Sequence, residues 1–179
     1  PRDLLTTAAG DTYVLNSKTI AKLNGDNPGE IVGSGLTSAI SFTAAPGGGF
    51  YVIDNSTAIK KVDTAGTVTV RATIPSSQGG IWASSDDTLY FTDANNRRIN
   101  KLSPGGVLST FVQLPTTPSG LIRKPDGGFY VRYNTGAIVS VSDAGEIRSF
   151  ATVSGAQGSA IDPSGRMYVT TATQVRVLD

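Results

Sequence analysis

Residues 88–102, with the sequence TLYFTDANNRRINKL, contain the pattern that decides the fold. The pair Tyr90-Phe91 is followed about ten residues later by the run Ile99-Asn100-Lys101-Leu102, in which two aliphatic residues enclose a variable pair. A polar segment centred on Asp93 and Arg97 separates the two. Two alternating apolar runs joined by a polar turn are typical of a β-hairpin.

The same pattern recurs along the whole chain. The aromatic-aliphatic pairs are Tyr13-Val14, Tyr51-Val52, Tyr90-Phe91, Tyr130-Val131 and Tyr168-Val169, and their tyrosines are 38, 39, 40 and 38 residues apart. A short polar turn precedes each pair, and an aliphatic-bracketed run follows it. In four of the five units a further turn ends at a glycine and leads into another strand; these glycines are Gly29, Gly66, Gly106 and Gly145. Because nothing shows a useful 3.6-residue period, the repeat is one of strands.

Each unit therefore reads as four antiparallel strands, and four-stranded units that repeat about every 40 residues are typical of a β-propeller. The sequence predicts an all-β fold, a single β-propeller domain over residues 1–179, with the apolar first strand of each blade next to the axis. The expected blades cover residues 1–35, 36–79, 80–119, 120–158 and 159–179. A β-sandwich or a β-solenoid is the alternative, but a sandwich does not need five copies of one pattern. We expect the five tyrosines to pack blade against blade.

The chain length corresponds to about five blades, the last without its outer strand. One interpretation is a closed five-bladed ring, which we favour, and the other is an open arc from a propeller of six or more blades. An open arc would expose the apolar faces of its end blades, at about 25 cal/mol per Å², unless a second chain covered them. A dimer is therefore expected if the ring is open.

Composition excludes several kinds of chemistry. The chain has no Cys and no His, so it can form neither a disulfide nor a site that needs a thiol or an imidazole. Its 15 basic and 14 acidic side chains balance, so no overall field attracts nucleic acid. The apolar runs are much shorter than the roughly 20 residues that span a bilayer. Absence of cysteine is compatible with an extracellular or periplasmic location, which we take as the working expectation.

Residues 88–102 resemble the core of an NHL repeat, and the five units together are similar to those of virginiamycin B lyase-like propellers. Only the third unit is close. The second keeps the acid of the motif as Asp54 but lacks the arginine, and the fourth and fifth lack the acid. The resemblance implies a propeller but not one activity, since this fold carries lyases, lactonases, RNA-binding domains and sensors.

The resemblance to enzyme families implies particular catalytic and metal-binding residues. Virginiamycin B lyase-like enzymes use a histidine base and a divalent metal, so that activity is not expected here. Lactonases of the gluconolactonase type hold a cation with Glu, Asn and Asp oxygens near the axis. This chain has only Glu30 and Glu146, both expected on outer strands, and the central acids are limited to Asp3 and Asp162. We therefore predict no metal, no other cofactor and no catalytic residue.

The remaining hypothesis is a non-catalytic module that binds a protein or a glycan at the channel mouth. Its expected ligand-binding residues are Trp82, Arg123, Lys124 and Asp162. Basic residues, among them Arg97, Lys101 and Arg132, have Tyr133 nearby and suggest RNA. Alternating lysines on strands are more simply solvated, so we expect no nucleic acid binding. The alternative functions are a metal-dependent lactonase or lyase and an RNA-binding NHL domain.

Overall fold

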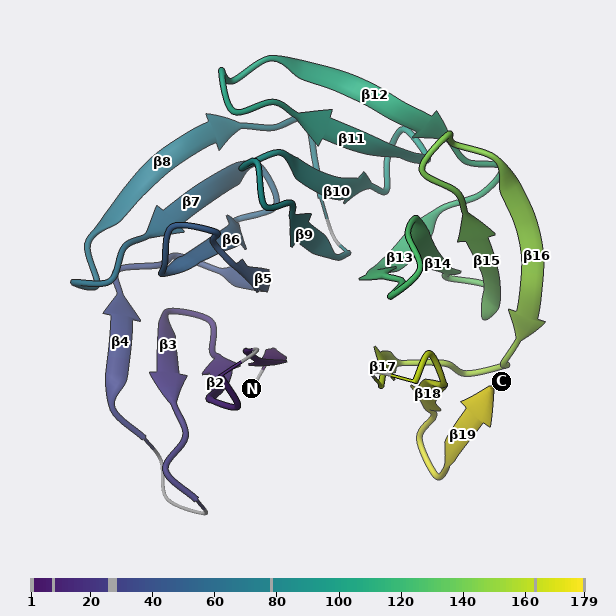
Figure 1. The fold of residues 1–179 in the computed structure, drawn as a ribbon, viewed down its shortest axis with the longest axis horizontal. Helices are drawn as coiled ribbons and strands as arrows, with labels where there is room; N and C mark the ends of the chain where they lie inside the picture. The colour runs from purple at the N-terminus through teal and green to yellow at the C-terminus, as the bar shows by residue number, and fades with distance from the viewer. Residues whose placement is uncertain (1, 8, 26–28, 78, 163, 179) are drawn as a thin grey trace.

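The computed structural model describes residues 2–7, 9–25, 29–77, 79–162 and 164–178, and it is built from strands arranged as blades around a common centre (Figure 1). Blade 1 contains β1 (Asp3–Thr6), β2 (Thr12–Leu15), β3 (Thr19–Lys22) and β4 (Ile31–Ser34). Blade 2 contains β5 (Ala39–Ala44), β6 (Phe50–Asp54), β7 (Ala58–Val62) and β8 (Val68–Thr73). Blade 3 contains β9 (Ile81–Ala83), β10 (Leu89–Asp93), β11 (Arg98–Leu102) and β12 (Leu108–Gln113).

Blade 4 contains β13 (Pro118–Arg123), β14 (Phe129–Tyr133), β15 (Ala137–Val141) and β16 (Ile147–Thr152). Blade 5 contains β17 (Gly158–Ile161), β18 (Met167–Thr170) and β19 (Val175–Leu178). Every blade is an antiparallel sheet whose strands follow chain order. The predicted all-β propeller of five blades, the last one without its outer strand, is therefore confirmed.

The five innermost strands, β1, β5, β9, β13 and β17, surround the centre, and each contacts the next one along the chain (Figure 1). Their outer edges pair with the tyrosine strands, for example Tyr90 opposite Trp82. The other edge of each innermost strand faces the central channel. Residues of these strands therefore determine the chemistry of the channel.

Alternation along the tyrosine strands sends successive side chains to opposite faces of a blade. In blade 2, Phe50 and Val52 pack toward blade 1, while Tyr51 and Ile53 pack toward blade 3. Tyr13 meets Phe50 of the next blade with ring centroids 4.8 Å apart, and Tyr90 meets Phe129 of the next blade at 5.2 Å. Tyr130 packs on Phe150 of its own blade, at 4.5 Å, within the cluster shared with blade 5.

Four hydrophobic clusters fill the four interfaces between successive blades. Among the residues that the structure describes, none joins blade 5 to blade 1. The faces that would meet there are open: Leu4 of β1 is 60% exposed, and Val175 and Val177 of β19 are 64% and 52% exposed. Figure 1 shows the same separation between the first and last blades. The five blades thus form a ring in which the described residues of the first and last blades share no hydrophobic cluster, and a dimer that covers these faces stays a prediction.

None of the described segments forms a helix with the length and apolar character that crossing a bilayer requires.

Candidate functional site

The central channel contains two cavities, one at each end of the innermost strands. The first has a volume of about 290 Å³ and lies where these strands begin. We call it the Arg132 cavity, and its charged and polar side chains are those of Arg2, Asp3, Ser41, Ser119, Arg132, Gln157 and Ser159. The second has a volume of about 460 Å³ and lies where the strands end. We call it the Trp82 cavity, and its apolar side chains include Leu4, Leu5, Trp82, Ile122 and Ile161.

Asp3 stands at the start of β1 and lines both cavities. One carboxylate oxygen accepts hydrogen bonds from the Ser41 hydroxyl at 2.8 Å and from the Phe42 amide at 3.3 Å. The other accepts from the Leu4 amide at 2.9 Å. No Lys or Arg of the described chain forms an ion pair with Asp3. Burial therefore outweighs these hydrogen bonds and raises the pKa of the Asp3 carboxyl.

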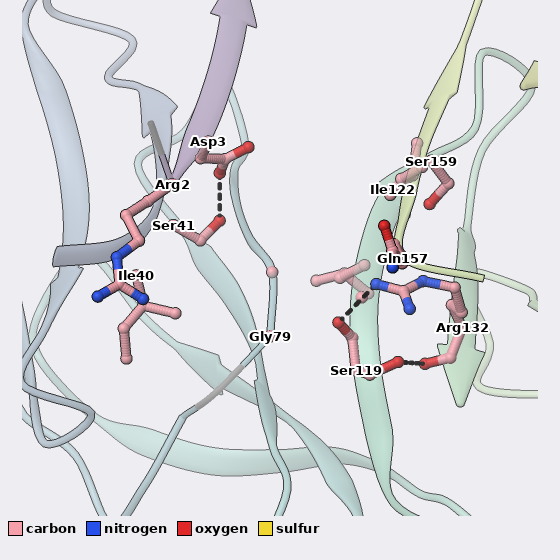
Figure 2. Close-up of a pocket in the computed structure, with 14 residues that line it drawn as sticks. Arg2, Asp3, Ile40, Ser41, Gly79, Ser119, Ile122, Arg132, Gln157 and Ser159 are labelled. Atoms are coloured by element: carbon pink, nitrogen blue, oxygen red, sulfur yellow. Dashed lines mark hydrogen bonds between the residues drawn. The ribbon is translucent and has the colours of Figure 1, made fainter. Parts of the chain in front are cut away.

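Arg132 of β14 approaches the channel from the opposite wall. Figure 2 shows its guanidinium pointing toward the cavity from one side, with Asp3 and Ser41 on the other. The guanidinium donates to the backbone oxygens of Ala156, at 2.7 Å, and Ser119, at 3.2 Å. Its Nε is buried and has no acceptor among the described residues. Such an unpaired buried donor is typical of a position that a ligand or water completes.

A β-bulge in β13 lies opposite this arginine. Pro118 pairs with Tyr133 and Gly120 pairs with Arg132, so Ser119 is the extra residue. The bulge turns the Ser119 carbonyl toward the guanidinium, and the Ser119 hydroxyl donates to the Arg132 carbonyl at 3.3 Å. Gly120 lies directly beside the guanidinium, and a Cβ there would be 3.4 Å from the Arg132 Nε, in contact with it. Burial lowers the pKa of the Arg132 guanidinium.

Trp82 and Arg123, two of the four ligand-binding residues expected from sequence, both line the Trp82 cavity. The Arg123 guanidinium lies 4.8 Å from the centroid of the Trp82 ring. Arg123 also pairs with Asp143, with 2.6 Å between Nη1 and Oδ1. The structure therefore brings these two side chains together on one wall of the Trp82 cavity.

The other two expected residues lie elsewhere. Lys124 pairs with Asp126 at 3.3 Å and lies over the Tyr130 ring, beside a separate pocket of about 270 Å³ between blades 4 and 5. Asp162 closes the turn between β17 and β18. Hydrogen bonds from Ser164, the Arg166 amide and the Tyr168 hydroxyl lower the pKa of Asp162. These two residues are not joined to the channel wall that contains Trp82.

Arg132 was considered from sequence only as part of a basic set for RNA, and Asp3 only as a central acid. A signal for Arg132 is nevertheless present in the repeat. The residue two positions after each repeated tyrosine is Leu15, Ile53, Thr92, Arg132 or Thr170. Only blade 4 places a cation there, at a position that faces the next blade. A charged residue that breaks the local pattern of a repeat is a mark of a functional position.

The side chains do not fit the divalent cation that a gluconolactonase-type resemblance implies. Among the described residues, no group of three His, Cys, Asp or Glu side chains could hold a metal ion. Asp3 is the single acidic residue of the Arg132 cavity, which also contains Arg2 and Arg132. A hard cation needs several oxygen ligands, and two guanidinium groups oppose its charge. This cavity is instead suited to a polar ligand on which negative charge develops.

Comparison with protein families gives one match. The family model described as SMP-30/Gluconolactonase/LRE-like region matches residues 76–177. These residues include the β9–β12 blade, the bulged strand β13 and Arg132. No curated protein sequence matches the chain.

Comparison with solved structures gives the same fold. A gluconolactonase from Xanthomonas campestris is 18% identical with a TM-score of 0.78, and the match covers 96% of this chain and 69% of that one. Virginiamycin B lyase from Staphylococcus aureus is 18% identical with a TM-score of 0.73, covering 98% of this chain and 68% of that one. A putative gluconolactonase is 15% identical with a TM-score of 0.72, covering 98% and 75%.

These findings correct the functional hypothesis made from sequence. A non-catalytic binding module is wrong, because the matching family model is that of the SMP-30/Gluconolactonase/LRE-like region. The enzyme alternative is favoured instead. The physical reason for the error is that the absence of His and Cys excludes particular mechanisms but leaves carboxylate and guanidinium chemistry available.

Proposed function

Because the chain belongs to the SMP-30/gluconolactonase/LRE-like family, we propose that it is an enzyme that hydrolyses a cyclic ester in the Arg132 cavity. The observation that carries the proposal is the placement of Asp3 and Arg132 on facing walls of one polar cavity (Figure 2). Ester hydrolysis needs a base that activates water and a positive group that stabilises the oxyanion. These two side chains supply one of each.

Asp3 is the proton carrier of this reaction. Its raised pKa makes the carboxylate a stronger base than an exposed aspartate, and it lets the acid form persist long enough to return the proton. The Ser41 hydroxyl and the Phe42 amide fix the orientation of the carboxylate. No Lys or Arg of the described residues is bound to Asp3, so its basicity is not reduced by an ion pair.

Arg132 stabilises the negative charge of the tetrahedral intermediate. Asp3 takes one proton from water while the water oxygen bonds to the ester carbonyl carbon, and the carbonyl oxygen becomes the oxyanion. The ring C–O bond then breaks, and its alkoxide oxygen receives the proton from Asp3. One water is consumed, a hydroxy acid is formed, and both residues return to their starting states.

The test is lactone hydrolysis, followed with a pH indicator on four-, five- and six-membered-ring substrates with and without a chelator. We expect Asp3→Asn to lower kcat/KM by about 100-fold or more. Arg132→Met should lower it by about 100-fold to 1,000-fold, and Arg132→Lys by less. The activity should persist in the chelator, because neither residue acts through a metal.

Matched controls separate chemistry from general damage. Asp11→Asn changes an exposed acid of blade 1, and Arg148→Met changes an arginine whose side chain is 81% exposed. Both should keep wild-type rates, and circular dichroism should show the strand spectrum in all five variants. The proposal is wrong if no lactone is hydrolysed faster by the wild type than by Asp3→Asn.

A further inference from the structure

The two halves of the channel differ in chemistry. The Arg132 cavity measures about 290 Å³ and is lined mainly by charged, polar and glycine residues, with Ile40, Leu121 and Ile122 as its apolar lining. The Trp82 cavity is larger, at about 460 Å³. It contains the partly exposed apolar side chains of Leu4, Leu5, Trp82, Ile122 and Ile161, beside the polar side chains of Thr6, Thr43 and Arg123. A ligand that matched only the polar half would leave this apolar surface in water. The channel as a whole is therefore amphipathic.

The halves are joined at a common boundary. Five residues line both cavities: Asp3, Ser41, Leu121, Ile122 and Ser159. The proposed catalytic carboxylate thus stands where the polar half meets the apolar half. A group attached to a ring that reacts at Asp3 has direct access to the Trp82 cavity.

We propose that the substrate is a lactone that carries an apolar chain, with the ester ring between Asp3 and Arg132 and the chain in the Trp82 cavity. The inference rests on the proposed hydrolysis and adds the substrate class. Burial of each methylene group in an apolar site contributes about four-fold to binding. A chain of several methylenes therefore gives a large preference over the unsubstituted ring.

Trp82 and Arg123 provide a fixed wall for this chain. The Trp82 ring packs edge-on against Phe129, with centroids 5.6 Å apart, and Arg123 covers part of it. The Arg123 guanidinium already forms an ion pair with Asp143, with 2.6 Å between Nη1 and Oδ1. Its charge is therefore balanced without an anionic ligand. The wall favours an uncharged apolar group.

Kinetics with two lactones test the inference. γ-Butyrolactone has the ring alone, and γ-decalactone adds a hexyl chain. We expect kcat/KM to be at least about ten-fold higher for γ-decalactone. Leu4→Ser should reduce this ratio several-fold, because it should lower γ-decalactone hydrolysis more than γ-butyrolactone hydrolysis. Val175→Ser is the matched control, because Val175 is similarly exposed, at 64% against 60%, but lies on β19 and lines neither cavity.

A binding measurement gives a readout that does not require hydrolysis. Trp82 is the chain's one tryptophan, so its emission reports directly on the Trp82 cavity. The lactam 5-hexyl-2-pyrrolidinone, which resists hydrolysis, should shift this emission, whereas 2-pyrrolidinone should not.

The outcomes distinguish the two proposals. An emission shift without hydrolysis of any lactone supports the apolar subsite and overturns the proposed activity. Hydrolysis of both lactones at equal kcat/KM, with no emission shift, supports the activity and overturns the apolar subsite. Equal loss on both lactones in Leu4→Ser also overturns it, because the variant would then act on the ring site or the fold.

Discussion

The Tyr51 hydroxyl in blade 2 donates to both carboxylate oxygens of Asp87, at 2.8 and 2.9 Å, in the turn that precedes β10 of blade 3. Tyr51 is fully buried. Its ring contributes to the hydrophobic cluster between the two blades, while its hydroxyl adds a charge-assisted hydrogen bond across the same interface. This hydrogen bond therefore joins blades 2 and 3 at one of the five repeated tyrosines.

Tyr51→Phe should lower the free energy of unfolding by about 1.5–3 kcal/mol, because it leaves the carboxylate of Asp87 without this donor. Urea denaturation measures the change. Tyr13→Phe is the matched control: Tyr13 packs on Phe50 in the same way, but its hydroxyl donates to no group among the described residues. Equal losses in the two variants would show that the hydrogen bond contributes nothing.

Alkaline pH should weaken the same contact. Burial, followed by the neighbouring Asp87, raises the pKa of Tyr51 above its ordinary value of 10.0. A group whose pKa is raised by folding contributes stability that is present below its unfolded value and is lost as pH rises through the folded value. The wild type should therefore lose stability above about pH 10, and Tyr51→Phe should lose less. Identical slopes for the two proteins would contradict this assignment.

Asp54 is expected to be a structural carboxylate. It is buried, accepts from the amides of Thr37 and Ser38, and pairs with Lys60 at 2.6 Å. Burial alone would raise the pKa of Asp54, but the bonds from Lys60 and the two amides outweigh it and the pKa is lowered. Asp54→Asn should cost about 3 kcal/mol or more, because Lys60 then lacks its partner.

The pH dependence of this variant has a defined sign. A lowered carboxyl pKa contributes stability above the ordinary value of 3.8, and the contribution disappears as pH falls through the folded value. The cost of Asp54→Asn should thus shrink in acid, as urea denaturation at several pH values would show. Asp63→Asn, an exposed turn aspartate that accepts from the Ala65 and Thr67 amides, is the control and should cost about 1 kcal/mol or less.

Equivalent positions of β1 and β9 test whether the face of blade 1 that contains Leu4 is open in solution. Leu4 pairs with Val14, and Ile81 pairs with Phe91, at the same place in the repeat. Ile81 is 5% exposed in an interface between blades, whereas Leu4 is 60% exposed. Ile81→Ala should cost about 2–5 kcal/mol, and Leu4→Ala about 0.5 kcal/mol or less. A similar cost at both positions would mean that the face containing Leu4 is covered in solution.

The repeat predicts the architecture because each blade buries the same positions. The alternating side chains of a tyrosine strand must satisfy two neighbouring blades, so one pattern returns about every 39 residues and fixes strand order and blade number. The polar turn around Asp93 was also predictable, since the Asp93 carboxylate accepts hydrogen bonds from the side chains of Asn96 and Arg98 within the same hairpin. The repeat does not predict whether the first and last blades pack against each other, because that depends on the angle between neighbouring blades.

The site was harder to predict because it is made by exceptions to the repeat. Arg132 interrupts a position where the other blades have Leu15, Ile53, Thr92 and Thr170. It lies opposite a bulge at Ser119 that blade 2 also has, at Ile40. Bulges leave no residue signature in a single sequence. Asp3 and Arg132 are also 129 positions apart, and only the ring of innermost strands brings them to one cavity. Trp82 and Arg123 both lie on innermost strands and line one cavity, and their part in ligand binding stays a prediction.

Asp3 should differ from Asp54 in the sign of its effect on stability. Burial raises the pKa of Asp3, so folding disfavours its charged form. The contribution of Asp3 to stability is present below the ordinary value of 3.8 and is lost as pH rises through the folded value. At pH 7 the wild type therefore contains a carboxylate that weakens the fold, and Asp3→Asn should raise the free energy of unfolding by on the order of 1 kcal/mol.

The same substitution should abolish most of the lactone hydrolysis, so stability and activity change in opposite directions. This combination is characteristic of a site kept for function at the expense of the fold. Urea denaturation at pH 7 and at pH 3 measures the first effect, and the stabilisation should be smaller at pH 3, where Asp3 is protonated in both states. If Asp3→Asn instead destabilises the protein as Asp54→Asn does, the carboxylate has a structural role and the proposed mechanism loses its base.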